Sequence, residues 1–424
     1  MKTVEKEQGR CYYIAPNGSD DNSGLTPDQP LCSFRRINGA VLGPGDKVLL
    51  RCGGEWNEEL VINGRGSRDA WIEVNSYGEG KKPLIRRNGD ISERCVRVND
   101  PSFFRMENLE VCNAGAGIVL FYNESYHNHS VYISNVSAHH FYGLYRGCGS
   151  SSKNPAWQSY VAEDRVGFSL GIIVTGKDTS DMNDERVLTD FRVSDCEIYQ
   201  TGGGIGLDWC DHRCCDGSIV GKNKFGNVVW ERLHLYDNDV ADVSLTSMFL
   251  QCVTGAVLRD TVIDNGAGGA PWGTAAIHLQ LAKDVLIENV EIKNMPHTNV
   301  SDECGIDFET DVENCIIRGC SFENNAGAAI EFLCNFEMSP MAVSRNVVIE
   351  QCDFVHNNWA VLYNNPAQIL VQIWQHDNCP SVTVRDCRFS NPDGVVEIGG
   401  DGILDLFQTE GNVVLNATAV SAAM

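Results

Sequence analysis

Apolar and polar residues alternate in short strands along most of this chain, and the strands recur with a common pattern. Each repeat has the form x-V-x-I-x-N-x-x-I and ends at a turn marked by Asn and Gly. The repeats lie about 24 to 40 residues apart, a spacing typical of solenoids whose coils stack strands into parallel sheets. The pattern predicts an all-β fold, a single right-handed parallel β-helix of about ten coils with inserted loops. Clear repeats are FRVSDCEIYQTGG, VLIENVEIKNMP, CIIRGCSFENNAG and VVIEQCDFVHNN.

Two sets of equivalent positions in the repeats support stacked coils. One set is expected to pack small side chains beside apolar residues, and its members are Cys112, Cys196, Thr261, Val290, Cys320, Cys352 and Cys387. Four residues later, five coils carry an amide, and these amides are Gln200, Asn265, Asn294, Asn324 and Asn391. Because a buried polar side chain must form hydrogen bonds, we expect the amides to face inward and to bond to one another and to the turn backbone.

The repeat is interrupted in two places, but the chain is expected to form one domain over residues 1–424. Residues 149–190 are expected to hold loop insertions beside the binding face, with breaks at 149–166 and 175–190. Residues 400–424 are expected to add a last strand, VVLNATAV, and a tail. Insertions of this kind often line the binding face of a solenoid.

The first 60 residues have a sequence signature of their own. The stretch YYIAPNGSDDNSGLTPDQPLCSF, followed by GPGDKVLLRCGGEWNEELVI, resembles the first coil and cap of pectate-lyase-like right-handed β-helix proteins. The resemblance implies the same fold, with an N-terminal coil and cap over residues 1–60. This fold supports lyases, hydrolases, esterases and non-enzymatic spikes, so it does not by itself predict the chemistry. Asp20, Asp21 and Asn22 could contact calcium or form a solvated turn.

The formal charge of -24 limits the class of partner. A phosphate backbone needs a basic surface, which argues against nucleic acid, and a polyanion such as pectate would need a bridging cation. A neutral oligosaccharide is more compatible. No run approaches the roughly 18 apolar residues that cross a bilayer, so no membrane partner is expected. The segment MKTVEKEQGR lacks the apolar core of a secretory signal, which predicts a cytoplasmic protein unless a leader was removed.

The 18 cysteines are interpreted as reduced, buried thiols, because several occupy one repeated position beside apolar residues. The alternative is a zinc site formed by Cys210, His212, Cys214 and Cys215. No cofactor is otherwise implied, although clustered acids could hold calcium.

The first strand of successive coils predicts where chemistry could occur. Side chains alternate between the two faces of a strand, so Ile306 and Phe308 are expected to point inward and Asp307 outward. Aligning the coils by their apolar positions gives two outward rows. The first row is Gly206, Phe249, His278, Asp307, Glu331 and Leu362. The second row is Asp208, Gln251, Gln280, Glu309, Leu333 and Asn364.

Asp307 and Glu331 are expected to lie one above the other on the exposed face, because neighbouring parallel strands are about 4.8 Å apart. Glu309 lies two residues along the same strand, and three acids this close raise at least one pKa. Paired carboxylates with separated pKa values cleave glycosidic bonds, and a separation of about 5 Å suits a retaining mechanism. We assign Asp307 as nucleophile and Glu331 as general acid/base, with Glu309 tuning the pair or binding a sugar hydroxyl. The alternative is an ordinary set of exposed acids on an acid-rich surface.

Other members of the two rows are expected to contact the sugar. His278 would hydrogen-bond Asp307 or the substrate, and the two glutamines would bind hydroxyl groups. Asp208 is about 14 Å from Asp307 by strand spacing and would line a subsite. Aromatic rings at strand ends would stack on sugar rings, with Trp359 and Trp374 as further candidates. The residues expected to bind substrate are His278, Gln280, Gln251, Asp208, Asn364, Trp209 and Trp272.

The segment GIDFETDVENCIIRGCSFENNAGAAIEFL resembles the catalytic region of β-helical retaining glycosidases of the β-xylosidase type. In that family an Asp nucleophile and a Glu acid/base lie on adjacent coils of one sheet. Asp307 and Glu331 match that arrangement in residue type and in their one-coil separation. The resemblance therefore implies a retaining glycoside hydrolase.

The favoured prediction is a glycoside hydrolase that removes sugars from the ends of oligosaccharides. A polysaccharide lyase would need a Lys or Arg base and usually calcium, and neither outward row contains Lys or Arg. A non-catalytic carbohydrate-binding or structural β-helix, such as a spike, is the other alternative.

Overall fold

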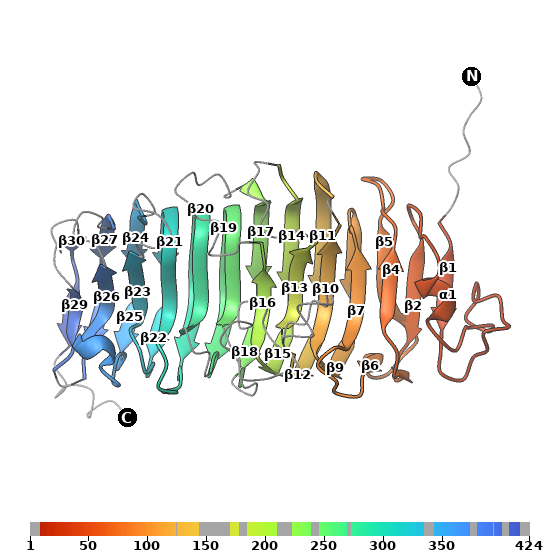
Figure 1. Ribbon diagram of the computed structural model, residues 1–424, viewed down its shortest axis with the longest axis horizontal. Helices are drawn as coiled ribbons and strands as arrows, with labels where there is room; N and C mark the ends of the chain where they lie inside the picture. Colours follow the sequence, from red (N-terminus) through yellow and green to blue (C-terminus); the bar gives the residue numbers. More distant parts are fainter. Residues whose placement is uncertain are drawn as a thin grey trace, which may run out of the picture.

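The computed structural model of the protein describes most of the repeat region. The described residues are 9–123, 125–143, 170–177, 185–209, 223–238, 246–268, 273–334, 343–373, 380–392, 394–400 and 407–415. Within them the strands pair in parallel, each with the equivalent strand of the next coil. Figure 1 shows the coils stacked along one long axis, from the N-terminal coils in red to the C-terminal coils in blue. The predicted parallel β-helix is confirmed.

The sheet that carries the candidate site is called sheet 1. It has eleven strands in the described part of the chain, close to the expected ten or so coils. Its strands, in order along the axis, are β4 (Leu60–Asn63), β7 (Arg94–Asn99), β10 (Ala116–Tyr122), β13 (Leu170–Gly176), β16 (Gly203–Leu207), the first parts of β19 (Thr246–Asp264), β20 (Thr274–Lys293) and β21 (Asp302–Arg318), then β23 (Ile330–Cys334), β26 (Ala367–Ile373) and β29 (Val396–Gly400).

Two further parallel sheets complete each coil. Sheet 2 contains β1 (Cys11–Ile14), β2 (Lys47–Arg51), β5 (Ile72–Tyr77), β8 (Phe104–Glu107), β11 (Asn128–Ser134), β14 (Leu188–Ser194), β17 (Phe225–Glu231), later parts of β19, β20 and β21, then β24 (Val347–Glu350), β27 (Val382–Arg385) and β30 (Phe407–Glu410). Sheet 3 contains β3 (Glu55–Trp56), β6 (Leu84–Arg86), β9 (Glu110–Ala114), β12 (Ser137–Phe141), β15 (Glu197–Thr201), β18 (His234–Tyr236), the ends of β19 and β20, then β22 (Ser321–Glu323), β25 (Asp353–Val355), β28 (Arg388–Ser390) and β31 (Val413–Leu415). Short helical turns accompany the strands, among them α1 (Arg35–Asn38) and η4 (Leu362–Asn364).

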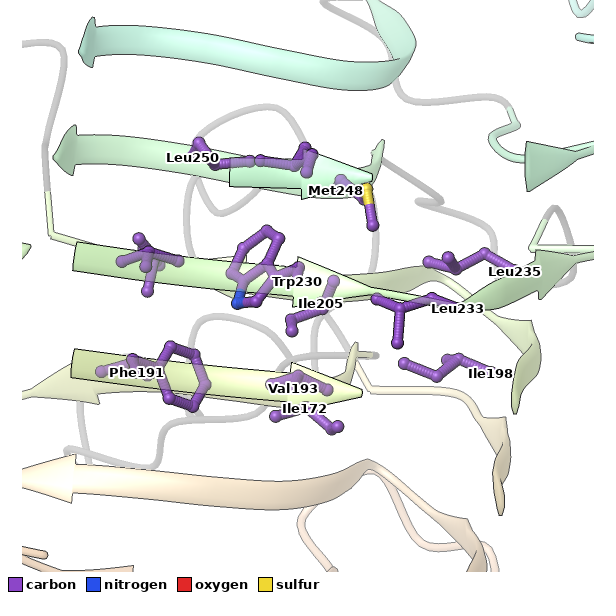
Figure 2. Close-up of a cluster of buried hydrophobic side chains, with 14 of the residues drawn as sticks. Ile172, Phe191, Val193, Ile198, Ile205, Trp230, Leu233, Leu235, Met248 and Leu250 are labelled. Carbon is purple, nitrogen blue, oxygen red and sulfur yellow. The ribbon is translucent and has the colours of Figure 1, made fainter. Parts of the chain in front are cut away.

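The interior between the three sheets is apolar and stacked coil upon coil. Figure 2 shows Ile205 and Met248 of sheet 1 meeting Trp230 of sheet 2 and Leu235 of sheet 3. Near the C-terminal end, the ring of Phe354 stacks on those of Phe322 and Phe389, with centroids 5.1 and 4.6 Å apart. Each coil therefore buries its apolar face mainly against its two neighbours.

The cysteine column is confirmed at four of its five cysteines. Cys196, Cys320, Cys352 and Cys387 each come directly before a strand of sheet 3, and all four are buried free thiols. The assignment of Cys112 was wrong, because this residue pairs with His139 inside the sheet, three positions further along the coil.

At Asn294 and Asn324 the amide column faces outward, contrary to expectation, whereas Asn391 accepts a hydrogen bond from the buried Gln368. Asn294 donates to Asp264 over 2.8 Å and Asn324 donates to Asn294 over 2.9 Å, on the outer side of the turns. Both asparagines have left-handed backbone angles, which turn their side chains away from the interior. The buried amides come one residue later, where Asn325 donates to Asn357 over 2.7 Å.

The predicted segment boundaries need one correction. Within residues 149–190, Thr175 belongs to β13, and residues 188–190 begin β14, so these positions are coil strands rather than inserted loops. Apart from Gly176, Lys177 and residues 185–187, the rest of the two expected insertions, and the tail after Leu415, lie outside the described residues.

The N-terminal turn shows no need for calcium at Asp20. Its carboxylate accepts hydrogen bonds from Ser33 Oγ (2.6 Å) and from the backbone N–H of Ser33 (3.1 Å) and Cys32 (3.3 Å). These bonds lower the pKa of Asp20 to about 2. Among the residues described, no helix is long and apolar enough to cross a membrane.

Candidate active site

Sheet 1 brings Asp307 and Glu331 together at one level of the solenoid. Ile306 and Phe308 both belong to the interior core, so the intervening Asp307 projects from the outer face of the sheet. Strand pairing places Asp307 opposite Glu331 and opposite His278 on the other side. The first outward row therefore has the register that the sequence predicts from position 206 to position 331.

The expected exposure of the two carboxyl groups was wrong. Asp307 is only 3 % exposed and Glu331 is fully buried. Leu370, which pairs with Glu331 on the next strand, is buried too, in a cluster with Ala328 and Ala367, so the outer face of sheet 1 is covered at this level. Strand alternation predicts which face a side chain leaves from, but it cannot predict what covers that face.

The second outward row holds as far as the glutamines and then breaks. Gln251 pairs with Gln280 in register and donates a side-chain hydrogen bond to it. Beyond that point the register shifts, so that Gln280 pairs with Thr310 and Glu309 becomes an extra residue. Such a bulge re-aims a side chain next to a functional site, and here it turns the largely buried Glu309 toward the acid pair.

The assignment of Asn364 to the second row was wrong, as was that of Leu362 to the first. Both lie in the turn η4, and Asn364 is exposed to solvent. The next strand of sheet 1 is β26, in which Leu370 pairs with Glu331 and Gln372 pairs with Leu333. Leu362 and Asn364 come 31 positions after Glu331 and Leu333, and a local apolar pattern did not determine the true rung over this interval.

Hydrogen bonds connect the row members, yet several polar atoms are left over. Nδ1 of His278 lies 3.0 Å from Oδ2 of Asp307, and the side-chain amide of Gln372 donates to Glu331. Among the described residues no hydrogen-bond partner contacts Oδ1 of Asp307, Oε2 of Glu331, Nε2 of His278 or Oε1 of Gln251, although all four atoms are buried. Buried polar atoms without partners are rare and mark places where a ligand can bind.

Asp302 is a fourth acid of this cluster that sequence reasoning missed. It stands at the start of β21, where a second register shift lets Thr274 pair with it. Tyr363 donates a hydrogen bond from its hydroxyl to Oδ1 of Asp302 over 2.7 Å. The DE pair at this turn was the only sequence signal, and the contact with Tyr363 joins residues 61 apart in the chain.

Desolvation and mutual repulsion raise the pKa values of the four acids. Burial raises the pKa of Glu309 to about 8, helped by the charge of Asp307. Burial also raises the pKa of Glu331 well above its ordinary range, and the charges of Asp302 and Asp307 add to this effect. Burial raises the pKa of Asp307, but a hydrogen bond from Glu309 opposes the rise. Burial lowers the pKa of His278, which favours the neutral imidazole.

Two predicted binding residues are buried among other side chains. Asp208 lies at the end of β16 and accepts a hydrogen bond from Thr175 over 3.1 Å. Trp209 is 2 % exposed and packs edge-on against Phe225 in the interior core, so it is not the stacking surface that was expected. Trp272 and Trp374 lie outside the described residues, and Trp359 is 40 % exposed.

One group of side chains has the geometry of a metal site. His278, Asp307 and Glu309 each offer a ligand atom, and these atoms lie within 4.8 Å of one another. An imidazole with two carboxylates suits zinc or a similar transition metal better than calcium, which prefers oxygen ligands throughout. The other metal candidate, formed by Cys210, His212, Cys214 and Cys215, lies outside the described residues.

Comparisons with known proteins agree with this architecture. A lacto-N-biosidase from Bifidobacterium longum subsp. longum is 31 % identical over 137 residues, a match that covers 26 % of this chain and 9 % of that protein. The crystal structure of a GH136 lacto-N-biosidase from Eubacterium ramulus matches with a TM-score of 0.69 at 18 % identity, covering 96 % of this chain and 68 % of that one. The catalytic domain of a GH87 α-1,3-glucanase in complex with nigerose matches with a TM-score of 0.53 at 12 % identity, covering 99 % and 67 %.

The family model described as "Right handed beta helix region" matches residues 170–389, which is more than half of the chain. The matched stretch runs from the start of β13 into β28 and includes every acid of the candidate site. The chain therefore belongs to the right-handed β-helix family.

Proposed function

We propose that this chain is a glycoside hydrolase that acts on oligosaccharides, with Asp307 and Glu331 as its catalytic pair. One observation carries the proposal: the two carboxyl groups occupy paired positions on adjacent strands, each with a buried oxygen that lacks a hydrogen-bond partner among the described residues. Most glycoside hydrolases cleave the glycosidic bond with two carboxyl groups that flank it. The lacto-N-biosidase that shares a segment with this chain lends further support.

The strand geometry favours a retaining mechanism. Paired residues on neighbouring parallel strands are about 4.8 Å apart, which is near the separation of about 5 Å that retaining enzymes use. Asp307 would attack the anomeric carbon while Glu331 protonates the departing oxygen. Glu331 would then remove a proton from the water that releases the sugar.

The surroundings of the two groups support this division of roles. Burial, and after it the negative charges of Asp302 and Asp307, raise the pKa of Glu331, so this residue keeps the proton that an acid must give. His278 Nδ1 lies 3.0 Å from Asp307, and Glu309 hydrogen-bonds it as well. Both contacts favour the ionised form of Asp307 and oppose the burial that raises its pKa to about 8. A transition metal bound to His278, Asp307 and Glu309 would instead coordinate the Asp307 carboxylate and prevent it from acting as the nucleophile.

Neutral sugar hydroxyl groups fit the rest of the pocket. Oε1 of Gln251 and Nε2 of His278, which have no hydrogen-bond partner in the described part of the chain, offer hydrogen bonds to hydroxyl groups without adding charge. The shared segment favours a lacto-N-bioside over a xyloside as the sugar released. Removal of sugars from chain ends is part of the proposal, and internal cleavage of long polymers would contradict it.

A panel of nitrophenyl glycosides, including a β-xyloside and a β-lacto-N-bioside, tests this function. We expect Asp307→Asn and Glu331→Gln each to lower kcat/KM at least about 100-fold, the scale of a lost acid, base or nucleophile. Asp264→Asn is the matched control, since this acid lies on sheet 3 beside Lys293 and Asn294. Retention requires that the first sugar product has the anomeric configuration of the substrate, which proton NMR resolves.

The result also separates the alternatives. Full activity in both site variants would remove the proposed catalytic pair. A product that absorbs ultraviolet light, formed from a uronate polymer, would favour a lyase, and sugar binding without turnover would favour a binding protein.

A further inference from the structure

Residues 359–364 expose aromatic and apolar side chains beside the acid cluster. Val361 is 40 % exposed and Tyr363 44 % exposed, in the turn that precedes strand β26 of sheet 1. The backbone is left-handed at Val361 (φ 50°), Tyr363 (φ 58°) and Asn364 (φ 54°). Valine and tyrosine adopt this conformation rarely, and such strain gathers at functional sites.

The segment is held firmly in this conformation. The side-chain amide of Asn358 donates to the carbonyl groups of Asn365 (2.9 Å) and Ala367 (2.8 Å), and its oxygen accepts from the backbone N–H of Leu362. The backbone N–H of Ala360 bonds to the carbonyl of Ala326 over 3.1 Å. The turn is therefore tied both to β26 and to the loop before β23.

Tyr363 reaches from this turn into the acid cluster. Its hydroxyl donates to Oδ1 of Asp302 over 2.7 Å and accepts from the Asp302 backbone N–H over 3.0 Å. Asp302 in turn acts electrostatically on Glu331 and Asp307. One side chain thus combines a partly exposed ring with a hydroxyl fixed to a buried acid.

We propose that Tyr363 is a positioning and specificity residue of the site: its ring packs against a sugar of the substrate, and its hydroxyl holds Asp302 beside the catalytic pair. The apolar C–H face of a sugar ring packs well on an aromatic ring, and binding pockets commonly combine such a surface with a few fixed polar groups. The bond to Asp302 fixes the position of this ring relative to Glu331. This inference rests on the proposed function and assigns a residue that the outward rows did not include.

The two roles can be separated by three substitutions at one position. Tyr363→Leu removes the ring and the hydroxyl, and we expect KM to rise about 10-fold with a lower kcat, the scale of 1.4 kcal/mol of binding. Tyr363→Phe keeps the ring, so KM should stay within about 2-fold while kcat falls about 10-fold, because Asp302 loses the hydroxyl group that holds it in place. Tyr363→Trp should behave like Tyr363→Phe, and it replaces the Leu variant as the test of the ring if that variant fails to fold.

The control is Tyr236→Phe. Tyr236 donates its hydroxyl to Glu197 over 2.9 Å, the same kind of tyrosine–carboxylate bond, but on sheet 3. We expect its kinetic constants to stay at wild-type values. Asp302→Asn combined with Tyr363→Phe should lower kcat no further than either change alone, because both remove the same interaction.

Each outcome has a distinct meaning. A wild-type KM in Tyr363→Leu, or a wild-type kcat in Tyr363→Phe, overturns the role of Tyr363 while Asp307→Asn and Glu331→Gln remain inactive. A lower kcat in Tyr236→Phe as well would show that the loss of any tyrosine hydrogen bond slows the enzyme. That result would also overturn the proposed role of Tyr363. A wild-type protein that hydrolyses no glycoside removes the proposed function and this inference together.

Discussion

Charge burial is the dominant feature at the scale of single residues. Four acids, Asp302, Asp307, Glu309 and Glu331, share one largely desolvated region, and burial is the first cause of the raised pKa of each. Folding therefore takes up protons that the unfolded chain has already lost at neutral pH. The sequence predicted that three acids would crowd together, but the strength of the effect depends on the cover over sheet 1.

Glu309 gives a measurable consequence for stability. Its folded pKa of about 8 lies above the unfolded value of about 4.3. Between these values the folded state holds the extra proton, so the free energy of unfolding falls as pH rises through this window. Glu309→Gln cannot titrate, and we expect its stability relative to wild type to rise by at least about 1 kcal/mol between pH 5 and pH 8.

Urea unfolding of both proteins at the two pH values measures this difference. Glu323→Gln, on the exposed side of a sheet 3 strand, is the control for loss of a carboxyl group. A difference between wild type and Glu309→Gln that stays constant with pH would show that Glu309 is solvated in the folded protein.

At the scale of elements, strands follow the sequence pattern and turns depart from it. β21 has the predicted face alternation, yet its bulge adds Glu309 as an extra residue, and η4 replaces the strand expected at positions 361–364. Alternation is a local property of extended backbone. Bulges and left-handed turns depend on contacts with the neighbouring coil, so their positions were not predictable from one repeat.

The left-handed conformation of Val361 leads to a prediction about η4. A β-branched residue with φ 50° and ψ 56° is strained, and 40 % of its surface is exposed, so little burial is lost on removing the side chain. We expect Val361→Gly to raise the free energy of unfolding by up to about 1 kcal/mol, because relief of strain exceeds the added freedom of the unfolded chain. Chemical denaturation measures the change.

Val396→Gly is the matched control for that variant. Val396 is an exposed valine in the strand β29, and there the same substitution should destabilise by about 0.5 to 1 kcal/mol. Equal destabilisation at both positions would mean that the η4 turn is unstrained.

At the scale of the whole molecule, stability comes from stacking of coils on their neighbours. Phe354 lies between Phe322 and Phe389. Strands β23 and β26, which carry Glu331 and Gln372, belong to the same C-terminal part of the solenoid. We expect Phe354→Ala to lower the free energy of unfolding by about 3 to 5 kcal/mol, because the substitution leaves a cavity. Since contacts are mostly between neighbours, the loss should fall on the C-terminal coils first.

Hydrogen exchange and activity, followed together in urea, measure this. As urea rises, hydrogen exchange should accelerate in β23 to β28 before it accelerates in β1 to β8. Glycoside hydrolysis should be lost at the urea concentration at which exchange in β23 to β28 accelerates. Phe104→Ala, a substitution of a buried ring in β8, should show the opposite order. Uniform acceleration along the chain in both variants would mean that the solenoid unfolds as one unit.

The amino-acid sequence by itself determined the coil repeat, the inward core residues and the pairing of Asp307 with Glu331. These follow from the two-residue period of a strand and from the stacking of similar repeats in register. Both properties are local, and the sequence of each repeat contains them. Only the tertiary structure decided that the acids are buried, that Asp302 joins them, and that Gln372 rather than Asn364 continues the row. These features depend on contacts between residues far apart in the chain, such as Tyr363 with Asp302, and no repeat pattern encodes such contacts.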